Sequence, residues 1–156
     1  MTRMLMTVVA CVALFATPAL AELNYLFEAD LTGDQEVPPS GSGAGGVASV
    51  ILNEDMTMAN YTISFAGLEG GEQVGGHLHL APAGENGPVI LDFGLGTPVS
   101  GVWEPSAEEA EALMNGEVYV NIHTEQFPGG EIRGQLIQTT VGTESESLSN
   151  LKTLFQ

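Results

Sequence analysis

The sequence predicts an all-β fold, a Greek-key sandwich or barrel of about seven or eight short strands with one short crossover helix. Between residues 23 and 140, apolar side chains recur at every second position, which is the repeat of a half-buried strand. Clusters of Gly, Pro, Asn and Asp separate these stretches. A chain of 156 residues, 44% of them hydrophobic, can bury one core, so we expect a single domain over residues 22–140.

The strands are predicted in order from this alternation. In the first, over residues 23–31, Leu23, Tyr25 and Phe27 alternate with polar side chains. Further strands are predicted at residues 46–52, 58–65, 76–80, 88–93, 118–124 and 131–139. The turn at 53–55 and the loop at 125–130 have hairpin length, so the strands on either side of each should pair. The Gly- and Pro-rich segment 33–46 is expected to be a surface connection.

One helix is predicted over residues 107–115. Ser106 can act as its N-cap, and Glu109 stands three positions later, which is the spacing of a capping box. Gly116 is placed to end the helix. We expect this helix to cover one end of the sandwich.

The first residues resemble an export signal. Arg3 precedes an apolar run over residues 4–15, and Ala19-Leu-Ala21 has the small-x-small pattern of a cleavage site. The run is shorter than the about 20 residues that span a bilayer. We therefore expect a signal peptide over residues 1–21, cleaved after Ala21, and a secreted or periplasmic protein with no integral membrane segment in the mature chain. Lipid attachment at Cys11 is the less favoured alternative, because that position would cut the apolar run in half.

The last residues, 141–156, differ in composition from the predicted domain. A polar spacer is followed by Leu148, Leu151, Leu154 and Phe155 at helical spacing. This pattern indicates a short amphipathic tail that either packs on its own domain or serves as a tag for sorting or for a partner protein.

The charge of the chain excludes several kinds of partner. Its 20 acidic residues against 3 Lys and Arg give a formal net charge of −17, and loss of Arg3 with the signal peptide deepens it to −18. Nucleic acid and anionic lipid surfaces would repel such a protein. Loss of Cys11 leaves no cysteine, so disulfides, thiol catalysis and cysteine-bound zinc are excluded. Any metal site must use histidine, carboxylate or backbone oxygen ligands.

The three histidines of the chain are predicted to share one strand face. His77 and His79 are two positions apart, so both point away from the face of Leu78, which belongs to the core. In the strand at 118–124 the apolar residues Val118, Val120 and Ile122 claim the core, which leaves Tyr119, Asn121 and His123 on the opposite, solvated face. If the two strands belong to one sheet, the three imidazoles form a site suited to copper or zinc.

Other polar side chains are predicted on the same face. In the last strand, Ile132 and Leu136 should turn inward and Glu131, Arg133 and Gln135 outward. We expect Asn121 and Arg133 to lie behind the three metal ligands, with Arg133 holding an anion near the ion or, alternatively, pairing with Glu131 or another acid. A second interpretation is a metal-free extracellular or periplasmic module for protein interaction or adhesion, in which these side chains form a hydrogen-bonded polar ladder. An enzyme is not expected, because no nucleophile elbow, zinc-protease helix or paired-carboxylate setting occurs.

Four ordered motifs resemble the CHRD domain, named from chordin. They are Asp34-Gln-Glu-Val-Pro-Pro39, Gly76-His-Leu-His79 with Gly84-Glu-Asn-Gly-Pro88, Tyr119-Val-Asn-Ile-His-Thr124, and Phe127-Pro-Gly-Gly-Glu-Ile-Arg-Gly-Gln-Leu136. The resemblance covers about residues 23–138. It implies export and a Greek-key β-sandwich, since chordin is extracellular and bacterial domains of this type stand alone in secreted proteins.

A weaker resemblance is to copper/zinc superoxide dismutase. It implies that His77, His79 and His123 match copper ligands and that Arg133 matches the anion-guiding arginine. The chain lacks a bridging fourth histidine, a histidine-rich zinc loop and the cysteine of the subloop disulfide. Its negative charge would also oppose the steering of superoxide, so dismutase activity is not expected.

Overall fold

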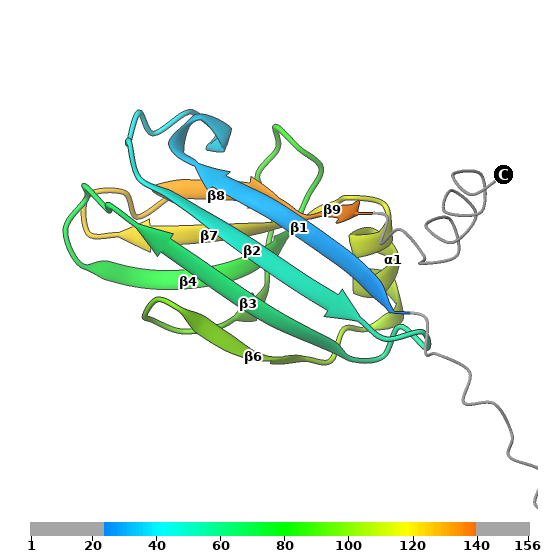
Figure 1. Cartoon of the computed structure of the whole chain (residues 1–156). Coiled ribbons are helices and arrows are strands. Elements are labelled where there is room, and N and C mark those ends of the chain that lie inside the picture. The colour runs from blue at the N-terminus through cyan, green and yellow to red at the C-terminus, as the bar shows by residue number, and fades with distance from the viewer. Residues whose placement is uncertain (1–23, 140–156) are drawn as a thin grey trace, which may run out of the picture.

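The computed structural model describes residues 24–139, which form an antiparallel, nearly closed β-barrel with one short helix (Figure 1). Eight strands follow one another around the barrel in the order β5-β4-β7-β8-β1-β2-β3-β6, and a ninth, β9, also pairs with β1. The strands are β1 (Tyr25–Thr32), β2 (Gly45–Leu52), β3 (Ala59–Ala66), β4 (Gln73–Leu80), β5 (Val89–Asp92), β6 (Val99–Trp103), β7 (Val118–Thr124), β8 (Ile132–Gln135) and β9 (Ile137–Thr139). The predicted all-β class is confirmed.

Three neighbouring pairs in this strand order are not consecutive in the sequence. β6 pairs with β3, β7 pairs with β4, and β8 pairs with β1. Such non-consecutive neighbours are the crossovers of a Greek-key arrangement. In Figure 1, β1, β2, β3 and β6 form one side of the barrel, and β4, β7 and β8 run behind them. In the core, the ring of Tyr61 from β3 and that of Phe93, which follows β5, lie 6.1 Å apart.

The core forms where the inward positions of both sides meet. Leu78 from β4, Val120 and Ile122 from β7 and Ile132 from β8 are all fully buried in it, as the alternation predicts. Each such side chain contributes about 1.5–3 kcal/mol of transfer free energy. The same alternation turns the intervening polar residues of β4, β7 and β8 to the outer face, where the three histidines lie.

The strand β6 was not predicted from the sequence. Its inward positions are Val99, Gly101 and Trp103, so a glycine stands where the apolar repeat needs a side chain. The ring of Tyr61 packs where a Cβ of Gly101 would be, and therefore it fills the place of the missing side chain.

The predicted strand at 131–139 divides in two. Leu136 lies between the two parts, fully buried, and its N–H donates to the carbonyl of Val118 on β7. Before this point β8 pairs with β7, and after it β9 pairs with β1.

The helix α1 (Ala107–Met114) forms where it was predicted and ends one residue earlier. The N–H of Ser106 donates to Glu109 Oε2 at 2.8 Å, and the N–H of Glu109 donates to Ser106 Oγ at 3.3 Å, so the capping box is complete. Gly116 takes a φ of 74° just after the C-cap, the left-handed conformation that favours glycine. Figure 1 shows α1 at one end of the barrel.

Two predicted segments lie outside the described residues: the signal peptide at 1–21 and the tail at 141–156. Among residues 24–139, no helix is long and apolar enough to cross a membrane.

Candidate metal centre

The three histidines meet on the outer face of β4 and β7. The two strands are antiparallel neighbours, with His77 opposite Asn121, His79 opposite Tyr119 and His123 opposite Gly75. One nitrogen of each imidazole ring lies within 4.8 Å of a nitrogen of the other two. The ring centroids of His77 and His123 are 4.7 Å apart, and that of His79 lies 5.6 Å from the first and 5.8 Å from the second. The predicted adjacency of the three rings is confirmed.

Hydrogen bonds fix which nitrogen of two rings is free. Nδ1 of His79 lies 3.0 Å from the carbonyl oxygen of Gly87, and Nδ1 of His123 lies 3.1 Å from that of Pro128. A carbonyl can only accept, so each Nδ1 must carry the proton and each Nε2 holds a lone pair. Both Nε2 atoms and Nδ1 of His77 are buried, and none of the three has a hydrogen-bond partner among the described residues.

Burial keeps two of these rings neutral. It lowers the pKa of His123 to about 4, assisted by the neighbouring His77 and opposed by the hydrogen bond to Pro128. Burial also lowers the pKa of His79. The hydrogen bond to Gly87 acts to raise this pKa, and the neighbouring His77 acts to lower it. Neutral imidazole is the form that binds a metal ion, so protons compete weakly with a cation here.

The spacing of the rings fits an ion after a small movement. Nitrogens that share a zinc ion at about 2.0–2.1 Å lie at most about 4.2 Å from one another. A separation of 4.8 Å, the upper limit in the cluster, therefore has to close by at least about 0.6 Å. Gly75 leaves room for this movement, because a Cβ there would lie 2.9 Å from Cε1 of His77 and 3.5 Å from Cδ2 of His123.

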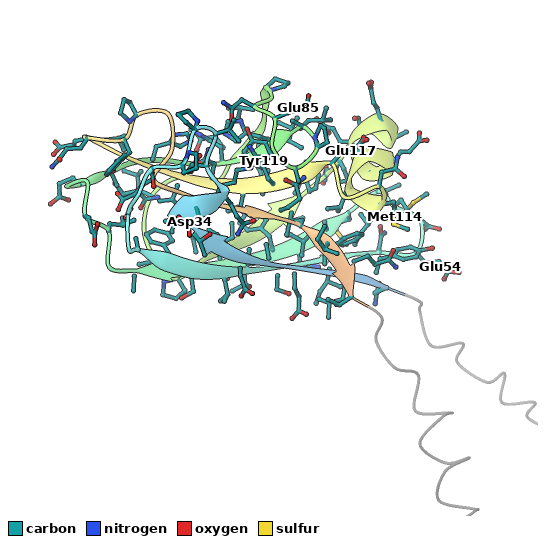
Figure 2. The ribbon with its side chains drawn as sticks, turned by 90° about the horizontal axis from the view of Figure 1, so that it is seen from above. Asp34, Glu54, Glu85, Met114, Glu117 and Tyr119 are labelled. Carbon is teal, nitrogen blue, oxygen red and sulfur yellow. The ribbon has the colours of Figure 1, made fainter. Side chains whose placement is uncertain are left out.

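Two stacked side chains support His79 from behind. Its ring is parallel to that of Tyr119 within 8°, with the centroids 4.9 Å apart. The guanidinium carbon of Arg133 lies 3.4 Å from the Tyr119 centroid. The hydroxyl of Tyr119 also accepts a hydrogen bond from the N–H of Gly87, and the carbonyl of Gly87 accepts one from Nδ1 of His79. Figure 2 labels Tyr119 on β7 and Glu85 in the loop that packs over this side of the barrel.

Arg133 is held by the loop that covers it. Nη1 donates to the carbonyl of Glu85 at 2.7 Å, and Nη2 donates to the carbonyl of Pro82 and to Gln135 Oε1, both at 3.2 Å. The residue is 1% exposed. The alternative expectation that it pairs with Glu131 is wrong, since all of these acceptors are other groups. The Arg133 guanidinium lies against the ring of Tyr119, so that ring stands between it and His79.

The expectation that this face is solvated is also wrong. Side chains on it are buried to the same degree as the core: Tyr119, Asn121, His123, Glu131, Arg133 and Gln135 are each at most 9% exposed. Segments 33–44, 81–88 and 125–130 pack over β7 and β8 and provide the hydrogen-bond partners. Segment 33–44, expected to be a surface connection, is therefore part of this cover, together with the 3-10 helix η1 (Gly33–Gln35).

Asn121 contacts a buried carboxyl group that the sequence analysis missed. Its Nδ2 donates to Glu36 Oε2 at 3.5 Å, while Asn121 Oδ1 and Glu36 Oε1 are buried with no partner among the described residues. Burial raises the pKa of Glu36 to about 7, although Arg133 and the hydrogen bond from Asn121 lower it. Glu36 stands in a loop with no strand repeat, and thus no local pattern indicated its burial.

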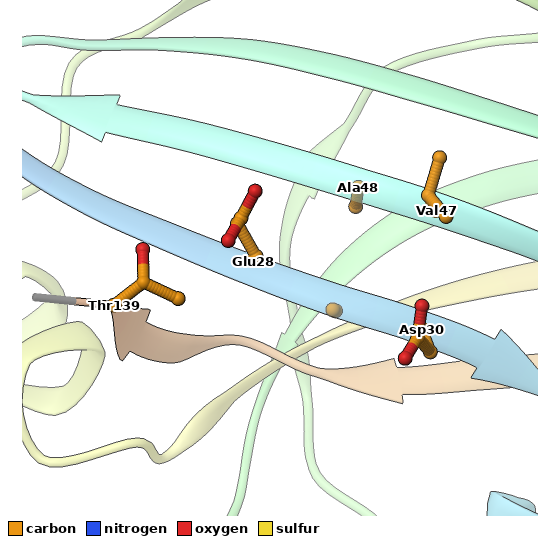
Figure 3. A pocket seen from close by; sticks show the side chains of 6 residues that line it. Glu28, Asp30, Val47, Ala48 and Thr139 are labelled. Carbon is orange, nitrogen blue, oxygen red and sulfur yellow. The ribbon is translucent and has the colours of Figure 1, made fainter. Parts of the chain in front are cut away.

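Another hollow lies away from the histidines. A groove of about 360 Å³ runs over the outer face of β1, β2 and β9, lined by Glu28, Asp30, Val47, Ala48 and Thr139 among others (Figure 3). The strands that line it carry no histidine. Its two carboxylates, Glu28 and Asp30, can be used as a control for nonspecific cation binding to the acidic surface.

Comparison with known proteins identifies one family. The family model described as CHRD domain matches residues 27–136. Neither curated proteins nor solved structures provide a match. The weaker resemblance to copper/zinc superoxide dismutase gains no support from these comparisons.

Proposed function

The chain belongs to the CHRD-domain family, and we propose that it is an exported binding protein that holds a copper or zinc ion on His77, His79 and His123. One observation carries the proposal: each of the three rings has one buried, unpartnered nitrogen, and the rings bring a nitrogen each to within 4.8 Å of one another. A buried polar atom without a hydrogen bond costs about 1–3 kcal/mol. One bound ion would satisfy all three atoms together.

The donor set supports these two metals. Neutral imidazole nitrogen suits copper and zinc, whereas magnesium and calcium prefer oxygen. The hydrogen bonds from Nδ1 of His79 and His123 to backbone carbonyls are the kind of support that orients metal-binding rings. Asn121 and Arg133 would act behind the ligands, the first opposite His77 in the sheet and the second through Tyr119.

Export and binding complete the proposal. The apolar run at residues 4–15 and the Ala19-Leu-Ala21 pattern support export to the periplasm or the medium. We assign binding rather than catalysis because the three ligand nitrogens have essentially no solvent-exposed surface that a substrate could reach.

A titration of the purified, metal-free protein tests the proposal. Calorimetry with Cu(II) and with Zn(II) should give one site per chain with a dissociation constant below about 10 μM for at least one of them. The double variant His77→Ala, His123→Ala should weaken that site at least about 100-fold. A matched control, Glu28→Gln with Asp30→Asn in the groove of Figure 3, should leave it unchanged. Binding that survives in the histidine variant would show that the acidic surface takes up the ion.

A substitution beside the ligands provides a second test. Gly75→Ala places a methyl group against the ring of His77 and should weaken binding about 3- to 10-fold, because the ring can no longer approach its partners freely. Gly45→Ala on β2 is the control, since its Cβ would meet only the carbonyl of Leu31 at 3.7 Å. Equal affinities of the two variants would contradict the ring movement.

The second candidate function is a metal-free interaction or adhesion module. The bonds of His79 and His123 to the covering loops favour it, because they also give the rings a purely structural use. In that case the histidine variants would lower the stability of the protein, and neither metal would bind to the original chain. Recovery of a specific partner from the envelope or the medium, with no metal bound, would support this candidate.

A further inference from the structure

The cluster offers three ligands and no fourth. Among residues 24–139, no carboxylate joins the three imidazoles within ligand distance of one another, and the only cysteine of the sequence is Cys11. Asp92 lies opposite His77 in the sheet, but its Oδ1 accepts the N–H of Gly94 at 2.8 Å and the residue is exposed. An ion in the cluster would therefore have three nitrogen neighbours from the protein.

A water molecule has little room to become the fourth ligand. All three ligand nitrogens are buried, and the rings of His79 and His123 are at most 8% exposed. The loops that carry the carbonyls of Gly87 and Pro128 close over the two rings. Structural zinc sites are almost always four-coordinate, and Cu(II) prefers a tetragonal arrangement. Both ions would lack a ligand here.

The charge of the site also disfavours a doubly charged ion. The free energy needed to bury an ion rises with the square of its charge, and so a divalent ion requires about four times as much as a monovalent one. Imidazole ligands carry no negative charge, so they do not compensate the charge of the ion. The nearest cation, Arg133, lies behind Tyr119 and His79 and repels a second positive charge. The acidic surface attracts cations from a distance, but it is solvated and screened.

These observations point to one ion, and the inference rests on the proposed function. We propose that the three-histidine centre selects copper(I), held by Nδ1 of His77 and by Nε2 of His79 and of His123. Cu(I) has a single charge, a filled d shell without a geometric preference, and an affinity for low coordination numbers. Among the ions of copper and zinc, Cu(I) is therefore the one that three enclosed imidazole nitrogens can bind without a further ligand.

The experiment compares three ions on the same metal-free protein. Cu(I) is titrated without oxygen against a coloured Cu(I) chelator, and Cu(II) and Zn(II) are titrated against chelators suited to each. We expect one Cu(I) per chain, bound at least about 100-fold more tightly than Zn(II) and more tightly than Cu(II). X-ray absorption of the Cu(I) protein should show three nitrogen neighbours. Ag(I), which has the same single charge, should displace Cu(I) from the site.

The outcomes separate this inference from the proposed function. If Zn(II) or Cu(II) binds as tightly as Cu(I) or more tightly, and His77→Ala with His123→Ala removes that binding, the metal site stands and the selection of Cu(I) is overturned. A fourth neighbour in the absorption spectrum overturns it as well. If no ion binds, both proposals fail. Circular dichroism of the histidine variant establishes that its loss of binding is not a loss of fold. Asp92→Asn, which keeps all three ligands, is a second variant and is measured in the same way.

Discussion

Glu36 and Glu131 are both buried on the covered face, but their surroundings shift their pKa values in opposite directions. For Glu36, burial dominates and raises the pKa to about 7. Burial also acts on Glu131, yet hydrogen bonds from the N–H of Glu69, from Thr124, from Ser42 and from the N–H of Gly70 outweigh it and lower the pKa. The number of donors around a carboxyl group thus decides whether it is buried as an acid or as an anion.

Glu36 should make the protein less stable as the pH rises from about 4.5 to about 7. Between these values the folded chain retains a proton that the unfolded chain has lost, so the stability present below about 4.5 is lost as the pH passes the folded pKa. Glu36→Gln imitates the protonated group and removes this dependence. Between pH 5 and pH 8 the variant should gain about 2 kcal/mol relative to the original protein, measured by urea unfolding at each pH.

The comparison is specific to Glu36, because every other side chain is the same in both proteins and its effect cancels in the difference. Glu28→Gln, an exposed change on β1, serves as the control and should give a difference that does not vary with pH. A difference between Glu36→Gln and the original protein that is the same at every pH would contradict a raised pKa in the folded state.

At the scale of elements, Glu131 connects the covering loops to the barrel. Oε1 accepts the hydroxyl of Ser42 at 2.7 Å and the N–H of Glu69 at 2.6 Å, and Oε2 accepts the hydroxyl of Thr124 at 2.7 Å. Its own carbonyl accepts the hydroxyl of Ser40 at 2.7 Å. One residue therefore fixes segment 33–44, the loop before β4 and the end of β7 at a single point.

Glu131→Gln should lower the free energy of unfolding by about 2–4 kcal/mol at pH 7. The amide turns an N–H₂ group toward donors that need an acceptor, so at least two hydrogen bonds are lost in a buried place. Because the pKa of Glu131 is lowered by folding, its contribution is present above the unfolded value and is lost as the pH falls; the loss in the variant should shrink in acid. Urea unfolding at pH 7 and pH 4 measures both effects.

Glu72→Gln is the matched control, since Glu72 lies in the same loop region and is exposed. Its stability should stay within about 0.5 kcal/mol of the original. If Glu131→Gln changed the free energy of unfolding as little as Glu72→Gln, the buried carboxylate would not be the group that joins the loops.

For the whole molecule, the described surface carries acids without basic partners. Arg133 is the one Lys or Arg within residues 24–139, and it is buried. Like charges on the surface repel one another and favour the unfolded chain, and salt screens this repulsion.

The melting temperature should therefore rise with ionic strength. Between about 20 mM and 500 mM salt we expect about 1 kcal/mol of added stability, which corresponds to about 3–5 °C. Sodium chloride and choline chloride should act alike if screening is the cause, as followed by scanning calorimetry. The variant Glu28→Gln with Asp30→Asn carries less repulsion and should respond less. A melting temperature independent of salt would count against surface repulsion.

The histidine cluster was predictable because two local patterns agree. Leu78 between His77 and His79 identifies the core face of β4, and Val120 and Ile122 do so for β7. The pairing of β4 with β7 is a tertiary fact that alternation does not contain, and the family resemblance added the expected fold. β6 escaped prediction because Gly101 removes one side chain from the repeat and Tyr61 replaces it from another strand.

The buried state of the polar face could not be read from the strands. A period of two separates the faces of a strand, but it does not say what lies beyond the outer face. Here the burial of the outer face depends on segment 33–44. Ser42 and Ser40 of this segment contact Glu131, which follows them by 89 and 91 positions in the sequence. Long-range packing of this kind leaves no periodic signal, which is why Glu36 was missed and Arg133 was expected in a surface ion pair.

The closed position of the three ligand nitrogens also governs how fast an ion can come and go. With the loops at Gly87 and Pro128 in place, no open path leads to the lone pairs of His79 and His123. Entry and exit must then wait for these loops to open or for the half-buried His77 to swing outward. The residence time of the ion follows the rate of that opening as well as the strength of the three bonds, so even a moderately bound ion would be retained while the protein diffuses.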